Sequence, residues 1–245
     1  MQNIKKRLQK TGIVSIFRIK LFLIRMKTIT IRKTNEQLPV GKVICIGRNY
    51  VEHATEMKSE VPDKPVIFLK PSTALIRNGE NIVLPKISND VHHEVELVVA
   101  IGRDGKNIPA SDAYSYVLGY AIGLDMTLRD VQSEAKKKGL PWSIAKGFDT
   151  SAPISDIITA GQITDPHKLT ITCKVNGQIR QHSSTGKMIF KIEKLIEYIS
   201  SIFTLERGDL IYTGTPEGVG KVINGDLIEA EIEGILKISH KIISE

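Results

Sequence analysis

Residues 92–102 read HHEVELVVAIG, and this stretch indicates the fold of the chain. Most of its positions are apolar, several are β-branched and a glycine ends it, which predicts a buried β-strand over 93–101. Side chains two residues apart point to the same face of a strand, so we expect Glu94 and Glu96 side by side. Their face continues into apolar residues such as Val98, so the two carboxylates border buried surface.

The rest of the chain is expected to contain more strands than helices. Apolar runs predict strands at residues 43–46, 66–69, 116–124, 170–175, 178–181, 210–212, 227–232 and 235–238. Helices are expected over 48–57, 127–138 and 189–202. The dipeptide Asn176-Gly177 joins two of the strands and is a strong hairpin signal. Because the strands do not alternate regularly with helices, the pattern favours an α+β fold with a largely antiparallel or mixed sheet over a doubly wound α/β fold.

The charge of the chain is unevenly distributed. Its 34 Lys and Arg against 27 Asp and Glu give a net charge of +7. Residues 1–33 hold ten of the basic side chains and no acidic one, so the remainder carries about −3. A nucleic-acid-binding domain would carry its Lys and Arg on the folded body, so we expect no nucleic-acid partner.

Composition narrows the class of protein further. Hydrophobic residues make up 41% of the chain, as expected for a globular protein. No apolar run approaches the roughly 18–20 residues that span a membrane, so no membrane partner is expected. Cys45 and Cys173 are far apart, lack CxxC spacing and lie in β-like apolar runs. They are interpreted as reduced, buried thiols of a protein in a cytosol-type compartment.

Residues 1–25 allow three interpretations. They lack the unbroken apolar region and cleavage site of a secretory signal. A mitochondrial presequence fits their basic, acid-free character, although Ser15 is their only serine. The favoured interpretation is an upstream extension without a fold, because Met26 begins a stretch that looks like a natural protein start. A targeting or surface-binding helix is the next interpretation, and a structural helix is the third. We expect a basic extension over 1–25 and a single domain over 26–245, located in the cytoplasm, or in mitochondria if 1–25 is a presequence.

A third carboxylate extends the pair formed by Glu94 and Glu96. Asp125 ends another apolar strand, YAIGLDMT. One interpretation of the pair is a strand with a solvated face. The other is a cation site, because buried like charges are costly and a cation removes that cost. Three carboxylates without a thiolate pair or HExxH motif suit a hard cation such as Mg²⁺ or Mn²⁺.

Several polar residues are candidates for acid–base or binding roles. His53 and Glu56 are three residues apart on an expected helix, where Glu can orient His as a general base. Arg129 and Gln132 show the same spacing and could hold a substrate carboxylate. Each pair could equally consist of ordinary polar side chains on the solvent-exposed face of a helix. Lys146 lies between apolar residues and a glycine, in SIAKGFD, which suggests a positioned lysine.

The Gly-rich stretch over 213–221, TGTPEGVGK, resembles a P-loop but is not one. The spacing of its glycines is wrong, and Val222 stands where Ser or Thr should follow the lysine. The loop can still present backbone N–H groups and the Thr215 hydroxyl to an anion. No GxSxG elbow occurs, so a serine hydrolase is not indicated.

Taken together, these motifs resemble the fumarylacetoacetate hydrolase family from about Lys42 to the C-terminus. The matching blocks are GRNYVEHATEM, FLKPSTAL, HHEVEL, GYAIGLDMTLRDVQ, GLPWSIAKGFDTSAP, KVNGQIRQ, MIF and LERGDLIYTGTPEGVG. The match is closest to the single-domain branch that includes acylpyruvate hydrolases and oxaloacetate decarboxylases. The resemblance implies the family's mixed β-sandwich or roll with a few short helices, usually as a homodimer.

The resemblance also implies a metal and a catalytic pair. The family pattern makes Glu94, Glu96 and Asp125 the ligands of Mg²⁺, with Mn²⁺ or Ca²⁺ as alternatives. It makes His53 and Glu56 the catalytic dyad, on a short lid helix that orders over the ligand.

Further family positions fall at the substrate. Lys146, Gln132 and Thr215 correspond to residues at the 2-oxo acid end of the substrate, and Lys146 would help to neutralise an enolate. Arg48 and Arg129 match basic positions near that site.

The function implied is metal-dependent cleavage of a C–C bond in small 2-oxo acids. An acylpyruvate hydrolase would release pyruvate. The metal-bound 2-oxo group, which accepts the electron pair of the breaking bond, would equally serve decarboxylation or tautomerisation of oxaloacetate. The alternative is an isomerase or hydratase of 2-oxo-4-enoates, such as 2-hydroxyhepta-2,4-diene-1,7-dioate isomerase. A third hypothesis is a binder of 2-oxo acids without catalytic activity.

Overall fold

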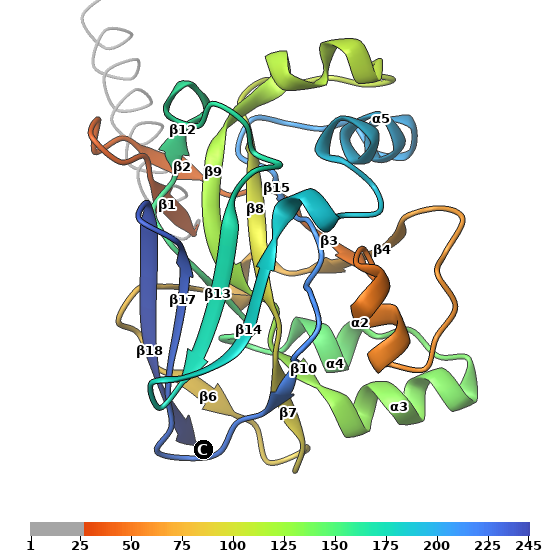
Figure 1. Cartoon of the computed structure of the whole chain (residues 1–245), viewed down its shortest axis with the longest axis vertical. Coiled ribbons are helices and arrows are strands. Elements are labelled where there is room, and N and C mark those ends of the chain that lie inside the picture. Colours follow the sequence, from red (N-terminus) through yellow and green to blue (C-terminus); the bar gives the residue numbers. More distant parts are fainter. Residues whose placement is uncertain (1–26) are drawn as a thin grey trace, which may run out of the picture.

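The computed structural model describes residues 27–245 (Figure 1). The expectations for residues 1–25 lie outside the described residues. Within 27–245, no helix is both long enough and apolar enough to cross a membrane.

An eight-stranded mixed sheet forms the centre of the molecule. Its strands are β4 (Val66–Lys70), β3 (Val43–Gly47), β15 (Leu210–Tyr212), β8 (Val95–Ile101), β9 (Val117–Leu124), β11 (Ala152–Ile154) and β5 (Leu75–Arg77) in spatial order, with β12 (Ile158–Thr159) also paired to β9. The pairs β15–β3 and β11–β5 are parallel, and the other pairs are antiparallel. The sheet is therefore mixed, as the sequence predicts.

A second sheet packs against the first. It contains β14 (Gln178–Ser184), β13 (Thr170–Val175), β17 (Leu227–Ile232), β18 (Leu236–Ser244) and β6 (Ile82–Leu84). Strand β13 contacts β8 and strand β17 contacts β9. Figure 1 shows β13 in front of the central strands, with β17 and β18 to its left. The two packed sheets enclose the larger part of the core, which confirms the predicted α+β sandwich-like fold.

Smaller elements complete the fold. A three-stranded sheet contains β10 (Thr127–Leu128), β7 (Val91–His93) and β16 (Gly220–Lys221), and β1 (Thr28–Thr30) pairs with β2 (Gln37–Pro39). The α-helices of the described residues are α2 (Val51–Glu56), α3 (Arg129–Lys138), α4 (Ser143–Gly147) and α5 (Ile192–Ile202). Short 3₁₀ turns span Ser72–Ala74, Ala110–Tyr116, Ala160–Gln162 and Thr185–Lys187. Figure 1 shows α2, α3 and α4 gathered at one side of the sheets.

Both faces of β8 are buried, but the predicted single strand over 93–101 is wrong. Odd-numbered residues such as Leu97 join the core between the sheets, and even-numbered residues such as Val98 join a second cluster. The chain leaves the ladder at Glu94, which separates β7 from β8. The reason is that β7 pairs with β10 and β16, whereas β8 pairs with β9 and β15, so two sheets meet at this residue.

Turns and helix ends differ partly from the expectations. The predicted hairpin is present, with positive φ at both Asn176 (52°) and Gly177 (76°). The helix expected over 127–138 begins only at Arg129, because the two preceding residues pair with β7, and it ends as predicted before Gly139, whose φ is 65°. The helix expected over 48–57 is shorter, since Arg48 has a left-handed backbone with φ of 59°.

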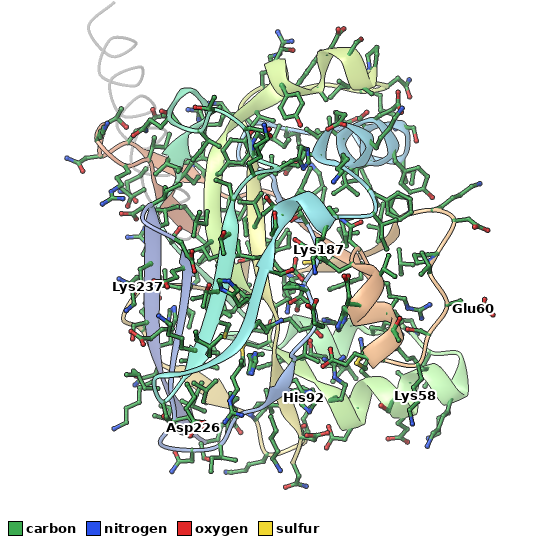
Figure 2. The ribbon with its side chains drawn as sticks, viewed as in Figure 1. Lys58, Glu60, His92, Lys187, Asp226 and Lys237 are labelled. Carbon is green, nitrogen blue, oxygen red and sulfur yellow. The ribbon has the colours of Figure 1, made fainter. Side chains whose placement is uncertain are left out.

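Most apolar side chains are buried and most charged side chains are exposed, as expected for a globular domain. The amphipathic helix α5 buries the four apolar positions that the periodicity predicts, Ile192, Leu195, Ile196 and Ile199. Cys45 and Cys173 are buried free thiols, as predicted. Charged residues stand on the outside, including Lys58, Glu60 and Lys237 (Figure 2). The exceptions include Asp209, which is buried next to β15 and paired with Lys42, and a group of ionisable side chains buried beside α3 and α4.

Candidate active site

The three predicted carboxylates meet in the interior. One oxygen from each of Glu94, Glu96 and Asp125 lies within 4.8 Å of the others, and each residue is at most 4% exposed. Glu96 lies on β8, opposite Gly123 of β9, and Asp125 follows directly after β9. The backbone N–H of Asp125 donates to the carbonyl of Glu94 at 2.8 Å, which holds the ends of the two strands together. The structure therefore brings together the three residues that the spacing singled out.

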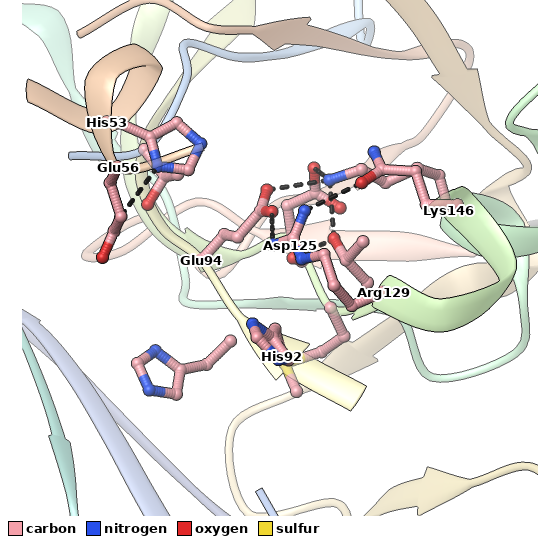
Figure 3. Close-up of polar contacts among 12 residues, drawn as sticks. His53, Glu56, His92, Glu94, Asp125, Arg129 and Lys146 are labelled. Carbon is pink, nitrogen blue, oxygen red and sulfur yellow. Dashed lines mark hydrogen bonds and ion pairs between the residues drawn. The ribbon is translucent and has the colours of Figure 1, made fainter. Parts of the chain in front are cut away.

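Two cations pair with these carboxylates. The ammonium of Lys146, on α4, donates to Glu94 Oε2 at 2.8 Å, Asp125 Oδ2 at 2.6 Å and Thr127 Oγ1 at 2.6 Å. Arg129 Nη2, at the start of α3, donates to Glu94 Oε1 at 2.5 Å. Figure 3 shows both side chains directed at the carboxylates. The short helices α3 and α4 thus bring positive charge to the acidic end of β8 and β9.

A third buried cation, Lys70, was missed by the sequence reasoning. Its Nζ lies 2.8 Å from Asp125 Oδ1, in an ion pair without hydrogen-bond geometry. It donates to the carbonyls of Met126 at 3.3 Å and Ser151 at 3.1 Å, and also to the carbonyl of Lys146. The sequence contains a signal for its burial, because this lysine directly follows the apolar run of β4.

The carboxylates differ in their electrostatic surroundings. Burial alone would raise the pKa of Glu94, but the neighbouring Lys146 and Arg129 hold it well below its usual range. The pKa of Glu96 lies well above its usual range because of burial and the nearby Asp125 and Glu94. Among residues 27–245, no Lys, Arg or His forms an ion pair with Glu96, and only the N–H of Gly214 donates to it, at 2.8 Å.

This arrangement fits a hard divalent cation. Glu96 has no cationic side chain as a partner within 27–245, although an oxygen of it lies within 4.8 Å of oxygens of Glu94 and Asp125. A cation bound between the three carboxylates would stabilise the ionised form of Glu96, which burial and the two neighbouring carboxylates disfavour. Oxygen donors of this kind suit Mg²⁺, Mn²⁺ or Ca²⁺. The residues that would hold the cation are Glu94, Glu96 and Asp125.

His53 and Glu56 lie on α2 and form a pair. His53 is 5% exposed, and its Nδ1 lies 3.3 Å from Glu56 Oε2, which leaves Nε2 free of this contact. Burial lowers the pKa of His53 below its usual value, which favours the neutral imidazole at pH 7. Gly218, in the Gly-rich loop, donates its N–H to both oxygens of Glu56 at 3.1 and 3.3 Å. Because His53 is buried, the pair is not an ordinary pair of surface side chains on a solvated helix.

The remaining predicted residues line the same pocket as His53 and Glu94. Gln132 is 3% exposed and accepts from Arg129 Nη1 at 2.8 Å. Thr215 is 2% exposed, and Arg48 is half-buried at the pocket wall. All ten predicted site residues therefore fall in or beside one pocket or its buried floor.

Gln181 is a second residue that sequence reasoning missed. Its Nε2 donates to Thr215 Oγ1 at 2.8 Å, and its Oε1 accepts from the N–H of Val95 at 3.0 Å. The same oxygen lies 3.0 Å from His93 Nδ1. A buried amide on β14 thus joins the Gly-rich loop to the start of β8. Its signal in the sequence was slight, a glutamine at the end of a predicted hairpin strand.

Comparisons with known proteins identify the family of the chain. The family model described as fumarylacetoacetate (FAA) hydrolase C-terminal matches residues 42–243. The rat protein named oxaloacetate tautomerase FAHD1, mitochondrial, is 51% identical over 200 residues, which cover 82% of this chain and 90% of that protein.

Solved structures agree as well. Fumarylpyruvate hydrolase from Pseudomonas aeruginosa, in complex with Mn²⁺ and pyruvate, superposes with a TM-score of 0.87 at 38% identity, covering 90% of this chain and 97% of that one. The 2-hydroxyhepta-2,4-diene-1,7-dioate isomerase from Mycobacterium marinum has a TM-score of 0.75 at 39% identity, covering 85% and 77%. The chain described here belongs to the fumarylacetoacetate hydrolase family.

Proposed function

We propose that this chain is a Mg²⁺-dependent enzyme that cleaves a C–C bond in small 2-oxo acids. Its substrates are acylpyruvates, from which it releases pyruvate, and it also tautomerises or decarboxylates oxaloacetate. The observation that carries the proposal is the buried cluster of Glu94, Glu96 and Asp125, two of which line one pocket together with His53, the partner of Glu56. The named activities of the rat and Pseudomonas relatives support it.

The metal site is assigned to the three carboxylates. A divalent cation bound there would act as a Lewis acid on the 2-oxo group and carboxylate of the substrate. The Mn²⁺ in the Pseudomonas hydrolase complex supports a divalent metal, and three oxygen ligands suit Mg²⁺ equally.

His53 acts as general base in the proposed hydrolysis. Its neutral imidazole takes a proton from a water molecule whose oxygen adds to C4 of the 2,4-dioxo acid, and Glu56 orients the ring. When the C3–C4 bond breaks, its electron pair passes to C3 and a carboxylic acid leaves. The pyruvate enolate that remains takes up a proton at C3 to give pyruvate.

The other pocket residues hold the substrate and its developing charge. Lys146 supplies positive charge beside the site of the enolate, and Arg129, Gln132 and Thr215 bind the 2-oxo acid end. Arg48 adds a cation at the pocket wall.

A second candidate is proton transfer without net C–C cleavage. The same base could remove a proton from C3 and return it at another atom, which isomerises the substrate. The likeness to the Mycobacterium isomerase and to the oxaloacetate tautomerase favours this candidate.

We also propose that the chain forms a homodimer in a reducing compartment. The edge strand β4 and the neighbouring α3–α4 segment expose the apolar side chains of Leu69 (44%), Leu140 (54%) and Ile144 (65%), which a second copy would cover. The free thiols fit the cytoplasm, or the mitochondrion named for the rat relative.

The experiment is a panel of acylpyruvates, oxaloacetate and 2-oxo-4-enoates with Mg²⁺, with products identified by mass. Pyruvate and a carboxylic acid from acylpyruvates are the expected products. A shifted double bond with intact carbon count would favour the isomerase instead. No turnover of any substrate, with Mg²⁺ or Mn²⁺, would contradict both.

A further inference from the structure

The Gly-rich loop contacts three parts of the candidate site. The N–H of Gly214 donates to Glu96 Oε2 at 2.8 Å, and the N–H of Gly218 donates to Glu56 Oε1 at 3.1 Å. Between these two glycines, Thr215 lines the pocket and is 2% exposed. The position of this loop therefore matters for the carboxylate cluster, for the pair on α2 and for the wall of the pocket.

One buried amide holds the middle of this loop. Gln181, on β14, is 1% exposed, and its Nε2 donates to Thr215 Oγ1 at 2.8 Å and to the carbonyl of Pro216 at 2.9 Å. At the other end of the amide, Oε1 accepts from the N–H of Val95 at 3.0 Å and lies 3.0 Å from His93 Nδ1. The second sheet is thus connected through one side chain to the loop and to the start of β8.

The partners of the amide determine which way it points. The N–H of Val95 can only donate and the carbonyl of Pro216 can only accept, so the oxygen of Gln181 faces the strand and its nitrogen faces the loop. A flipped amide would leave both backbone groups buried without a partner, which is costly. Both hydrogens of Nε2 are then used, one on Thr215 and one on Pro216.

The hydroxyl of Thr215 accepts from Gln181, which leaves its own hydrogen for another acceptor. Within residues 27–245, no protein group accepts a hydrogen bond from this hydroxyl. The residue lines the pocket that also contains His53 and Glu94. A hydroxyl that is fixed on one side by a donor is a preorganised donor on its other side, and a negatively charged oxygen is its best partner.

We propose that Gln181 is a positioning residue that fixes Thr215 as a hydrogen-bond donor to the carboxylate of the substrate. This inference rests on the proposed function, in which Thr215 binds the 2-oxo acid end, and it specifies the direction of that contact and the residue that sets it. Gln181 does not line the pocket itself and acts through Thr215. Without the amide, the hydroxyl can rotate toward backbone carbonyls of the loop and away from the substrate.

The test is a double-mutant cycle on the affinity for pyruvate, the product of the proposed hydrolysis. Isothermal titration calorimetry with Mg²⁺ gives the Kd of pyruvate for the wild type, Gln181→Met, Thr215→Val and the double variant. Thr215→Val should raise Kd about tenfold or more, the effect of one charge-assisted hydrogen bond. Gln181→Met should raise Kd about fivefold in the wild type and less than about twofold in the Thr215→Val background, because both changes act on the same hydroxyl. The KM for an acylpyruvate should show the same pattern.

Gln178→Met is the matched control, because Gln178 is exposed on the same strand. It should bind pyruvate as tightly as the wild type. Thermal unfolding shows whether each variant is folded. If Gln181→Met does not fold, Gln181→Asn takes its place, because its amide is one methylene shorter and cannot reach both Val95 and Thr215.

Two results would overturn the inference and leave the proposed reaction standing. One is an unchanged affinity for pyruvate in either single variant. The other is a double variant in which the two losses multiply, because Gln181 would then act independently of Thr215. A wild type that neither binds pyruvate nor turns over any acylpyruvate would overturn both the inference and the proposed function.

Discussion

The charge cluster and the helix α2 face the same pocket but are built in opposite ways. The charge cluster comprises Glu94, Glu96, Asp125, Lys70, Arg129 and Lys146, all at most 8% exposed. Its carboxylates and Lys70 lie on β-strands or directly next to them, and its other two cations come from α3 and α4. Helix α2 has six residues, and the side chain of its Glu56 is 33% exposed. The cluster is held by the central sheet and by buried ion pairs, whereas α2 depends on a few contacts, among them Gly218 with Glu56 and Lys187 with Glu52, each at 3.1 Å.

From this difference we expect the charge cluster to determine the affinity for a cation and α2 to determine the acid–base chemistry. Buried ion pairs hold rigid geometry, but removing one partner leaves a costly unpaired charge. A short helix with partly exposed contacts can be changed with little loss of stability. Substitutions in the cluster should therefore affect metal binding or folding, and substitutions in α2 should affect turnover alone.

The largest effect is expected from Glu96→Gln. Loss of one carboxylate ligand should lower kcat/KM on the order of a thousandfold, because the cation would no longer be held in place. The measurement is turnover of an acylpyruvate across a Mg²⁺ titration. If Glu96→Gln keeps the activity and Mg²⁺ response of the wild type, the assignment of the metal site is wrong.

Lys70→Met should chiefly affect folding. It removes the ion pair to Asp125 and the donor to three carbonyl groups, which should cost about 3 kcal/mol or more of unfolding free energy. Urea denaturation followed by circular dichroism measures it. The control is Lys237→Met, which breaks an exposed pair with Glu229 and should change stability little. An equal loss of unfolding free energy in the two variants would show that the buried ion pair stabilises the fold no more than the surface pair does.

His53 should set the acidic limb of the pH profile. Burial lowers its pKa, so the base stays neutral below pH 6.5, and kcat/KM should fall only as pH drops through that lowered value. His53→Gln should reduce kcat roughly a hundredfold or more and remove this limb, without loss of thermal stability. An acidic limb that persists unchanged in His53→Gln would assign the titration to another group.

The smallest effect is expected from Glu56→Gln. The amide can still contact His53 and Gly218 but no longer stabilises a protonated imidazole, so kcat should fall about tenfold. The exposed residue Glu60 provides the control, Glu60→Gln. A fall in kcat shared by both variants would point to a general effect of charge at α2.

The sequence predicted the parts of the molecule that obey local periodicity. Strand and helix existence followed from apolar spacing, and the Asn176-Gly177 hairpin followed from turn chemistry. The break of the strand at Glu94 did not, because it depends on pairing with two different sheets. The predicted start of α3 was two residues too early for the same reason, because Thr127 and Leu128 form β10 and pair with β7, which is distant in the sequence.

The candidate site was predictable where residues lie close in sequence or match a family motif. Glu94 and Glu96 followed from spacing of two, and His53 and Glu56 from spacing of three. The role of Lys70 in holding Asp125 was not foreseen, because only the folded sheet brings residues 55 positions apart into contact.

The central claim is that Glu96 completes a cation site. Thermal unfolding of the wild type and of Glu96→Gln, each with EDTA and with excess Mg²⁺, tests this claim most directly. Glu96 is crowded by Glu94 and Asp125, so Glu96→Gln should melt at the same or a higher temperature than the wild type in EDTA. Mg²⁺ should raise the melting temperature of the wild type and leave Glu96→Gln nearly unchanged. An equal rise in both proteins, or no rise in the wild type, would contradict the account.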